Sequence, residues 1–278
     1  MRIQLGYTPD ADDVYMLHAL LDGKVDARGL EFVPAEGNLQ TLNDRASRGE
    51  LEATMISAAS YALVRKHYVL GEAGSSFGIG CGPVILAREA LSEEALAGKT
   101  IAIPGATTTA YAVLQLYMPT LRTRILPFDK LIPAVEAGLV DCALVIHEEF
   151  IAYKQYGLRV VTDLSDWWAD RSGKLPMPVT CFALSRTLDE DVHKRIVATI
   201  ADSATYALQH RSEVLVAAMK YSHGAQPLAV DRFVREYVNT HSIEMGDAGR
   251  VALETFFEQT ARAGILPKAL PLDIVGRE

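Results

Sequence analysis

The residue in this sequence best suited to proton transfer is His147, which directly follows a run of apolar or small residues, Cys142 to Ile146. Such a run is typical of a strand buried on both faces of a sheet. Open α/β sheets bind their ligands beyond the carboxyl ends of such strands. Because the unperturbed pKa of histidine is close to neutral pH, His147 would suit the role of a general base. The alternative is a polar residue where the strand meets water, and this pattern alone leaves both open.

A second candidate site is the threonine turn Thr107 to Thr109, which precedes an apolar helix from Ala112 to Met118. The start of a helix offers backbone N–H groups and a favourable dipole to an anion, and hydroxyl groups add further donors. A helix cap explains one threonine but does not require three. No lysine or arginine lies close in the sequence. We therefore expect Thr108, Thr109 and Ala110 to bind a carboxylate rather than a phosphate.

Three aspartates, Asp10, Asp12 and Asp13, lie between a strand from Arg2 to Tyr7 and a helical segment from Val14 to Leu21. Capping of the helix and its dipole explain one or two of them. Three carboxylates within four residues exceed what a cap needs, and they follow the carboxyl end of a strand. We expect at least one to face a ligand, with Asp10 and Asp13 as the candidates and capping as the alternative.

The elements that would position these residues follow a common design. In 49–57 and in 138–147, a glycine is followed three residues later by an acid and then by an apolar strand that ends in a polar residue, Ser57 or His147. The first strand leads into a small polar run, which consists of Ser57, Ala58, Ala59 and Ser60. This likeness predicts two sheets that each present a strand end to a shared cleft.

Strands alternate with helices up to about residue 185, and the pattern then becomes mostly helical. This order predicts an α/β fold with a helical C-terminal tail. We expect a larger lobe formed by 1–95 and 189–278 and a smaller lobe formed by 96–188. Within the tail, the segment from Tyr237 to Ser242 is expected to be a polar loop between helices.

The composition excludes several classes of function. With 278 residues and a net charge of −8, the chain has a globular composition that suits neither nucleic acid nor an acidic membrane surface. No apolar stretch of about 18 residues appears. The N-terminus does not have the pattern of a secretory signal, and the three cysteines are expected to be reduced, so we expect a cytoplasmic protein. The spacing of cysteine and histidine suggests no metal site.

Five short motifs occur in order along nearly the whole chain: Thr8-Pro9-x-x-x-Asp13, Pro104-Gly105-x-x-Thr108-Thr109-Ala110, Val145-Ile146-His147-Glu148, Asp163-Leu164-x-x-Trp167-Trp168 and Tyr237-Val238-Asn239-x-x-Ser242. Each motif has little specificity by itself. Together they resemble the menaquinone-biosynthesis enzymes with a periplasmic-binding-protein-like fold, and most closely the 1,4-dihydroxy-6-naphthoate synthase family. The resemblance implies a two-lobed (type II) α/β fold with a ligand cleft between the lobes.

The resemblance also implies an activity: a carbon–carbon lyase of the futalosine pathway, which converts cyclic dehypoxanthine futalosine to 1,4-dihydroxy-6-naphthoate and dihydroxyacetone. In the family the histidine of the Ile-His-Glu motif is the catalytic base, which corresponds to His147. The small polar run and the threonine turn bind substrate there, which corresponds to Ser57, Ala58, Ala59, Ser60, Thr108, Thr109 and Ala110. No metal or redox cofactor is implied. The expected partner is a small carboxylated molecule, and both a monomer and a homodimer remain open.

Two departures from the family pattern concern the charge of the cleft. Many members have Ser-Pro-Cys-Pro-Asn-Asp where this chain has Thr8 to Asp13, so Asp12 adds a negative charge in place of an amide. A lysine that family members carry near the position of Ala58 is missing here. Both changes make the cleft less favourable for an anion. They affect the identity of the substrate more than the fold.

Two other functions are compatible with the same fold. The first is chorismate dehydratase of the same pathway, against which the Ile-His-Glu context of His147 argues. The second is a solute-binding protein that captures a small carboxylic acid without chemistry, because a fold does not determine a function. The N-terminal sequence, which does not resemble an export signal, argues against the second.

Overall fold

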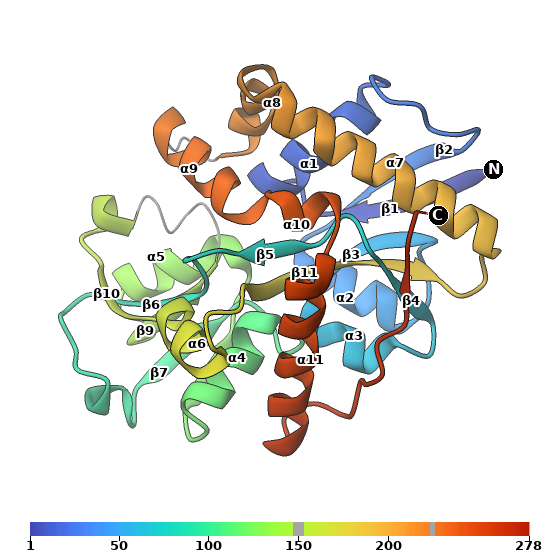
Figure 1. Cartoon of the computed structure of the whole chain (residues 1–278). Helices are drawn as coiled ribbons and strands as arrows, with labels where there is room; N and C mark the ends of the chain where they lie inside the picture. Colours follow the sequence, from blue (N-terminus) through green and yellow to red (C-terminus); the bar gives the residue numbers. More distant parts are fainter. Residues whose placement is uncertain (147–152, 223–225, 278) are drawn as a thin grey trace.

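Two β-sheets organise the chain, of which the structure describes residues 1–146, 153–222 and 226–277 (Figure 1). In this computed structural model the first sheet has the order β12-β4-β11-β3-β1-β2, and β5 pairs with β11. Its strands are β1 (Arg2–Tyr7), β2 (Glu31–Glu36), β3 (Ala53–Ser57), β4 (Tyr68–Gly71), β5 (Ser76–Gly78), β11 (Met177–Ser185) and β12 (Ile274–Val275). Because β1, β2 and β3 are parallel, their carboxyl ends meet at one edge of the sheet.

The second sheet has the order β10-β6-β9-β7-β8. Its strands are β6 (Val84–Ala87), β7 (Thr100–Ile103), β8 (Arg122–Ile125), β9 (Cys142–Val145) and β10 (Arg159–Asp163). All four residues of β9 are buried, which confirms the strand predicted from the apolar run. Strands β7 and β9 are parallel, so the carboxyl ends of both strands lie at the same edge of the second sheet.

Each sheet contains one strand from the range predicted for the other lobe. Strand β6, within 1–95, pairs with β9 and β10 in the second sheet. Strand β11, within 96–188, pairs with β3, β4 and β5 in the first sheet. We therefore propose that the chain crosses between lobes near Pro83 and near Pro176. Both strands are apolar, and a run of apolar residues does not indicate which sheet a strand will join.

Helices cover both sheets, and the predicted helical tail is present. The first part of the chain contributes α1 (Ala11–Leu21), α2 (Leu39–Ser47), α3 (Ala58–Val64), η1 (Glu94–Leu96), α4 (Thr109–Tyr117), η2 (Phe128–Lys130), α5 (Leu131–Glu136) and α6 (Leu164–Ser172). The tail contributes α7 (Glu190–Gln209), α8 (Arg211–Ala218), η4 (Met219–Tyr221), α9 (Pro227–Tyr237), α10 (Thr240–Ile243) and α11 (Gly246–Arg262). Helix α7 packs along α1 (Figure 1). None of the helices in these described ranges is long and apolar enough to cross a bilayer.

The prediction of a polar loop from Tyr237 to Ser242 is wrong, because three residues of the short helix α10 (Thr240–Ile243) lie in this segment. Asn239 accepts a hydrogen bond from the backbone N–H of His241 over 3.0 Å, and the Ser242 hydroxyl accepts one from the backbone N–H of Asn239 over 3.4 Å. These polar residues therefore cap a helix. Polarity alone does not distinguish a cap from a loop.

One hydrophobic cluster extends across both sheets. It contains Ile56 and Leu70 from the first sheet and Ile101 and Leu144 from the second, all completely buried. Burial of apolar side chains is the main favourable contribution to folding, so this shared cluster stabilises the two lobes against each other. The carboxyl ends of β3, β7 and β9 are thereby held around a common space.

Candidate functional site

The first side of the site is the end of β3, which continues directly into α3. All four residues of the small polar run, Ser57, Ala58, Ala59 and Ser60, are buried. Ser57 is the residue before the helix, and its backbone is not helical (φ −57°, ψ 138°), so α3 begins directly after it. The backbone of Ala59 and the side chain of Ser60 both make hydrogen bonds to the second lobe.

The second side is the threonine turn between β7 and α4. The hydroxyl of Thr108 accepts a hydrogen bond from the backbone N–H of Tyr111 over 3.3 Å and donates one to the carbonyl oxygen of Gly105 over 2.9 Å. Thr108 is therefore the N-cap of α4, which is the role expected for one of the three threonines. The first backbone N–H groups of a helix have no partner within it, so those of Thr109 and Ala110 are the donors that suit an anion.

The structure brings these two predicted segments into direct contact. The Ser60 hydroxyl donates to the carbonyl oxygen of Thr107 over 3.0 Å. The Thr109 hydroxyl accepts the backbone N–H of Ala59 over 3.2 Å and donates to the carbonyl oxygen of Val179 over 2.8 Å. Val179 lies where the register between β11 and β5 shifts, an irregularity that redirects backbone groups at functional edges of sheets. Residues of both sheets thus meet at one point.

Two side chains of α2, which the sequence reasoning missed, take part in this contact. The Gln40 Oε1 atom accepts hydrogen bonds from the backbone N–H of Thr107 over 3.3 Å and from its hydroxyl over 3.1 Å. Its Nε2 donates to Asp44 over 2.7 Å, which fixes the orientation of the amide. A side chain at Gly105 would collide with the amide of Gln40, so the glycine permits this close approach.

Asn43 is the second of these side chains, and it is 2% exposed. Its Oδ1 accepts the backbone N–H of Ser57 over 2.9 Å, and its Nδ2 donates to the Ser57 hydroxyl over 3.0 Å. The same Nδ2 lies 3.5 Å from the carbonyl oxygen of Thr107. A signal for Asn43 exists in the sequence, because it lies four residues after Leu39 and three before Ala46, on the predicted apolar side of the helix.

A small cavity of about 10 Å³ lies between the two segments. It is lined by Leu39, Ser57, Pro83, Thr109, Ala110, Ile146, Met177, Pro178 and Val179. Ile146 directly follows β9 and precedes His147, the predicted general base. His147 itself lies outside the described residues. The predicted binding residues Ser57, Thr109 and Ala110 therefore line one cavity with the residue next to that histidine.

Ile146 also lines a larger cavity of about 510 Å³. Its other lining residues are Gly80, Cys81, Gly82, Tyr153, Lys154, Asp163, Leu228, Ala229, Arg232, Phe233, Glu236 and Tyr237. Burial raises the pKa of Asp163 at the end of β10, although hydrogen bonds from Ser165 lower it in part. Burial raises the pKa of Cys81 to about 12, so this cysteine remains a thiol at neutral pH and does not suit a nucleophile.

The three aspartates are buried around the start of α1. Asp10 accepts the backbone N–H of Asp13 over 3.3 Å as the N-cap, and Asp13 accepts the backbone N–H of Thr8 over 2.9 Å. Burial raises the pKa of Asp12, and a hydrogen bond with Asp10 lowers it in part. Capping thus accounts for contacts of Asp10 and Asp13, and substrate binding by these two residues stays a prediction.

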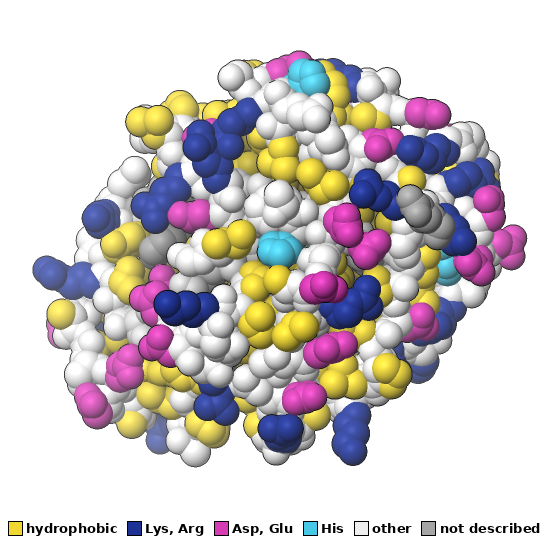
Figure 2. Space-filling view, viewed as in Figure 1, with side chains coloured by type: hydrophobic (Ala, Val, Ile, Leu, Met, Phe, Trp, Pro, Cys, Tyr) yellow, Lys and Arg dark blue, Asp and Glu magenta, His cyan; other side chains and the backbone are white. Residues whose placement is uncertain are grey.

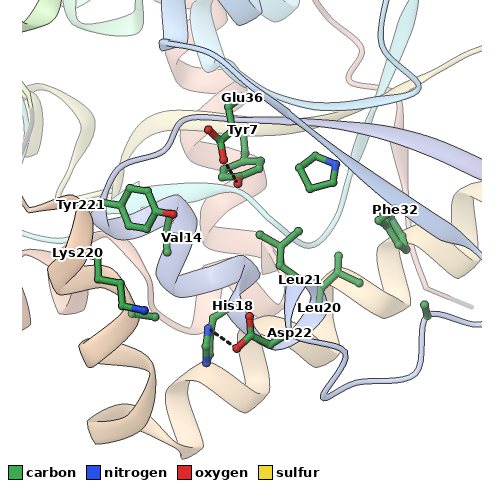
Figure 3. A pocket seen from close by; sticks show the side chains of 13 residues that line it. Tyr7, Val14, His18, Leu20, Leu21, Asp22, Phe32, Glu36, Lys220 and Tyr221 are labelled. Carbon is green, nitrogen blue, oxygen red and sulfur yellow. Dashed lines mark hydrogen bonds and ion pairs between the residues drawn. The ribbon is translucent and has the colours of Figure 1, made fainter.

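A separate cavity of about 400 Å³ lies in the first lobe beside α1 (Figure 3). Figure 3 shows the Tyr7 hydroxyl directed at Glu36, to which it donates a hydrogen bond over 2.8 Å. Burial and this carboxylate raise the pKa of Tyr7, which keeps the phenol neutral. In the same view, the Nδ1 atom of His18 lies 3.6 Å from a carboxylate oxygen of Asp22. Of the predicted site residues that the structure describes, none lines this cavity.

Basic and acidic side chains are interspersed on the face of the molecule in Figure 2. Oppositely charged side chains also pair along helices; for example, Arg232 lies 2.7 Å from Glu236 and Arg262 lies 3.3 Å from Glu258, each four residues away on its helix. A mixed surface of this kind differs from the basic stripe that nucleic acid requires.

Comparisons with known proteins agree with this architecture. The family model described as "Menaquinone biosynthesis" matches residues 3–262. The 1,4-dihydroxy-6-naphtoate synthase of Thermus thermophilus is 34% identical over 271 residues, which cover 97% of this chain and 98% of that protein. The protein of the same name from Streptomyces coelicolor is 30% identical over 276 residues, with 97% and 96% covered.

Solved structures show the same fold. Protein AF1704 from Archaeoglobus fulgidus has a TM-score of 0.91 and 38% identity, over 95% of this chain and 98% of that one. The alkanesulfonate-binding protein SsuA from Xanthomonas axonopodis pv. citri, bound to MOPS, has a TM-score of 0.72 and 15% identity, over 99% and 98%. The latter likeness shows the fold alone, and it confirms the periplasmic-binding-protein-like architecture. The fold, the family model and the named relatives together show that this chain belongs to the menaquinone-biosynthesis family of enzymes.

Proposed function

We propose that this protein is a carbon–carbon lyase that converts cyclic dehypoxanthine futalosine to 1,4-dihydroxy-6-naphthoate and dihydroxyacetone. The names of two relatives with at least 30% identity, both synthases of that naphthoate, support the proposal. The single observation that carries it is the contact between the Ser57–Ser60 segment and the threonine turn. The cavity beside this contact is also lined by Ile146, the residue before His147.

The substrate carboxylate would bind at the start of α4. The backbone N–H groups of Thr109 and Ala110 and the favourable end of the helix dipole provide neutral donors there. Because this chain lacks the lysine that family members carry near the position of Ala58, these neutral donors would take over the binding of the anion. The cavity of about 510 Å³ beyond Ile146 has the size of a small-molecule site, and it would accept the remainder of the substrate.

We assign the proton transfer to His147. As the residue after Ile146, it would remove a proton from the bound substrate. The carbon–carbon bond then breaks, His147 returns the proton to the three-carbon fragment, which leaves as dihydroxyacetone, and the remaining ring system becomes aromatic. Contact between the lobes would exclude water and align the base with the breaking bond. This sequence of steps needs no redox change, since the atoms of the substrate are divided between the two products.

The proposal is tested by incubation of the purified protein with cyclic dehypoxanthine futalosine. The expected result is 1,4-dihydroxy-6-naphthoate, identified by its absorbance and mass, together with an equal amount of dihydroxyacetone. Binding of the substrate without product would contradict the lyase and favour a solute-binding protein. Turnover of chorismate instead would favour the dehydratase. Absence of both binding and product would leave only the family and the fold.

A further inference from the structure

We propose that Asn43 is a positioning residue that makes the Ser57 hydroxyl a hydrogen-bond donor to an oxygen atom of the substrate. This inference rests on the proposed function for the location of the substrate. It depends otherwise on hydrogen-bond polarity, which follows from the chemistry of the two side chains.

The orientation of the Asn43 amide is determined by a backbone group. The N–H of Ser57 can only donate, and it lies 2.9 Å from Oδ1 of Asn43, so this atom is the amide oxygen. The other terminal atom is therefore the amide nitrogen, which can only donate. It lies 3.0 Å from the Ser57 hydroxyl oxygen. Ser57 must accept this hydrogen bond.

The hydroxyl hydrogen of Ser57 is consequently left to donate elsewhere. In 1–146, 153–222 and 226–277, no protein acceptor receives it. Ser57 is completely buried and lines the small cavity with Thr109, Ala110 and Ile146. A buried hydroxyl hydrogen without a partner is costly, so an acceptor on a bound ligand would stabilise the site. A carboxylate or carbonyl oxygen has the required chemistry, whereas an ammonium group does not.

Asn43 also lies close to a backbone group of the second lobe. The Nδ2 atom that donates to Ser57 lies 3.5 Å from the carbonyl oxygen of Thr107, which also receives the Ser60 hydroxyl over 3.0 Å. One amide group therefore contacts both sides of the cleft. Ser57, Thr109 and Ala110 line the same cavity, so the Ser57 donor and the first N–H groups of α4 lie around one space.

The test is a double-mutant cycle on the affinity for 1,4-dihydroxy-6-naphthoate, a carboxylated probe whose binding does not require turnover. In Asn43→Asp, a carboxylate oxygen would replace the amide nitrogen and accept the Ser57 hydroxyl hydrogen, which removes the donor from the cavity. We expect Asn43→Asp and Ser57→Ala each to weaken binding at least tenfold. The double variant should bind about as weakly as either single variant, because both changes remove the same donor.

The control is Thr41→Asp, which adds the same charge at an exposed position of α2 and should keep the affinity within about twofold. The inference would be overturned if the losses of affinity in the two single variants multiplied in the double variant. Unchanged affinity in Ser57→Ala would also overturn it, and this result is decisive even if Asn43→Asp fails to fold. If the wild-type protein does not bind the probe, the inference is wrong. A third outcome separates the two proposals. If the wild type binds the probe and the cycle gives the expected result, but cyclic dehypoxanthine futalosine is not converted, then the inference stands and only the proposed function is wrong.

Discussion

The hydroxyl of Ser60 donates a hydrogen bond over 3.0 Å to the carbonyl oxygen of Thr107, and this bond joins the end of β3 to the threonine turn that precedes α4. The two residues lie 47 positions apart in the sequence and belong to the two sides of the cleft. Ser60 is 1% exposed, so the bond is formed away from water. The arrangement of the cleft therefore depends on a small number of identifiable polar contacts.

Ser60→Ala should weaken substrate binding more than the chemical step. The change removes one buried hydrogen bond between the sides of the cleft, worth about 1 kcal/mol, which corresponds to roughly a fivefold rise in KM. We expect kcat to change less than twofold. Steady-state kinetics measures both, with Ser47→Ala on the exposed end of α2 as the control. A fall in kcat at constant KM would contradict a role in holding the cleft together.

Asp12→Asn should stabilise the protein at neutral pH. Burial raises the pKa of Asp12, so the folded protein holds this proton more tightly than the unfolded chain does. Stability therefore falls as the pH rises from the unfolded value of 3.8 through the raised folded value, and the penalty is fully present above it. The amide would remove this penalty. A gain of about 1 kcal/mol would raise Tm by roughly 2–4 °C.

The measurement for Asp12 is Tm as a function of pH, with the exposed Asp170→Asn as the matched control. The difference between wild type and Asp12→Asn should shrink as the pH falls toward 3.8, because both proteins are then neutral at this position. A difference that stays constant with pH, or a lower Tm for the variant at neutral pH, would show that the charge of Asp12 is not the cause.

Thr108→Val should reduce stability rather than affinity. The hydroxyl caps α4 through Tyr111 and donates to Gly105, and loss of an N-cap typically costs about 1 kcal/mol. Thr108→Ser keeps the hydroxyl and should restore the stability. Chemical denaturation and binding of the naphthoate probe separate the two roles. If binding weakened tenfold while the unfolding free energy stayed the same, Thr108 would be an anion ligand instead.

Local patterns in the sequence predicted the elements well. The apolar run ahead of His147 predicted β9, and the threonine turn predicted the start of α4, because each depends on neighbouring residues. The pairing of β6 with β9 was not predictable in this way. Strand pairing depends on residues far apart in the sequence, and an apolar strand fits either sheet. Lobe boundaries depend on this pairing, so local patterns in the sequence do not determine them.

For the candidate site, the sequence indicated Ser57, Ser60 and Thr109 but not the groups that connect them. The carbonyl oxygen of Val179 has no side-chain signature, since every residue has a carbonyl group. Asn43 did carry a signal as a polar residue on the apolar side of α2. Its partners, Ser57 and Thr107, are 14 and 64 positions away, so their identity required the folded structure.

The measurement that tests the central claim most directly compares His147→Ala with the wild type for turnover and binding of cyclic dehypoxanthine futalosine. The account predicts that turnover is lost while the affinity stays within about tenfold, or 1.4 kcal/mol, because the base acts on a substrate held by other groups. His210→Ala, an exposed histidine that stacks on Tyr206, is the control and should retain full activity. Undiminished turnover by His147→Ala would contradict the assignment of the catalytic base.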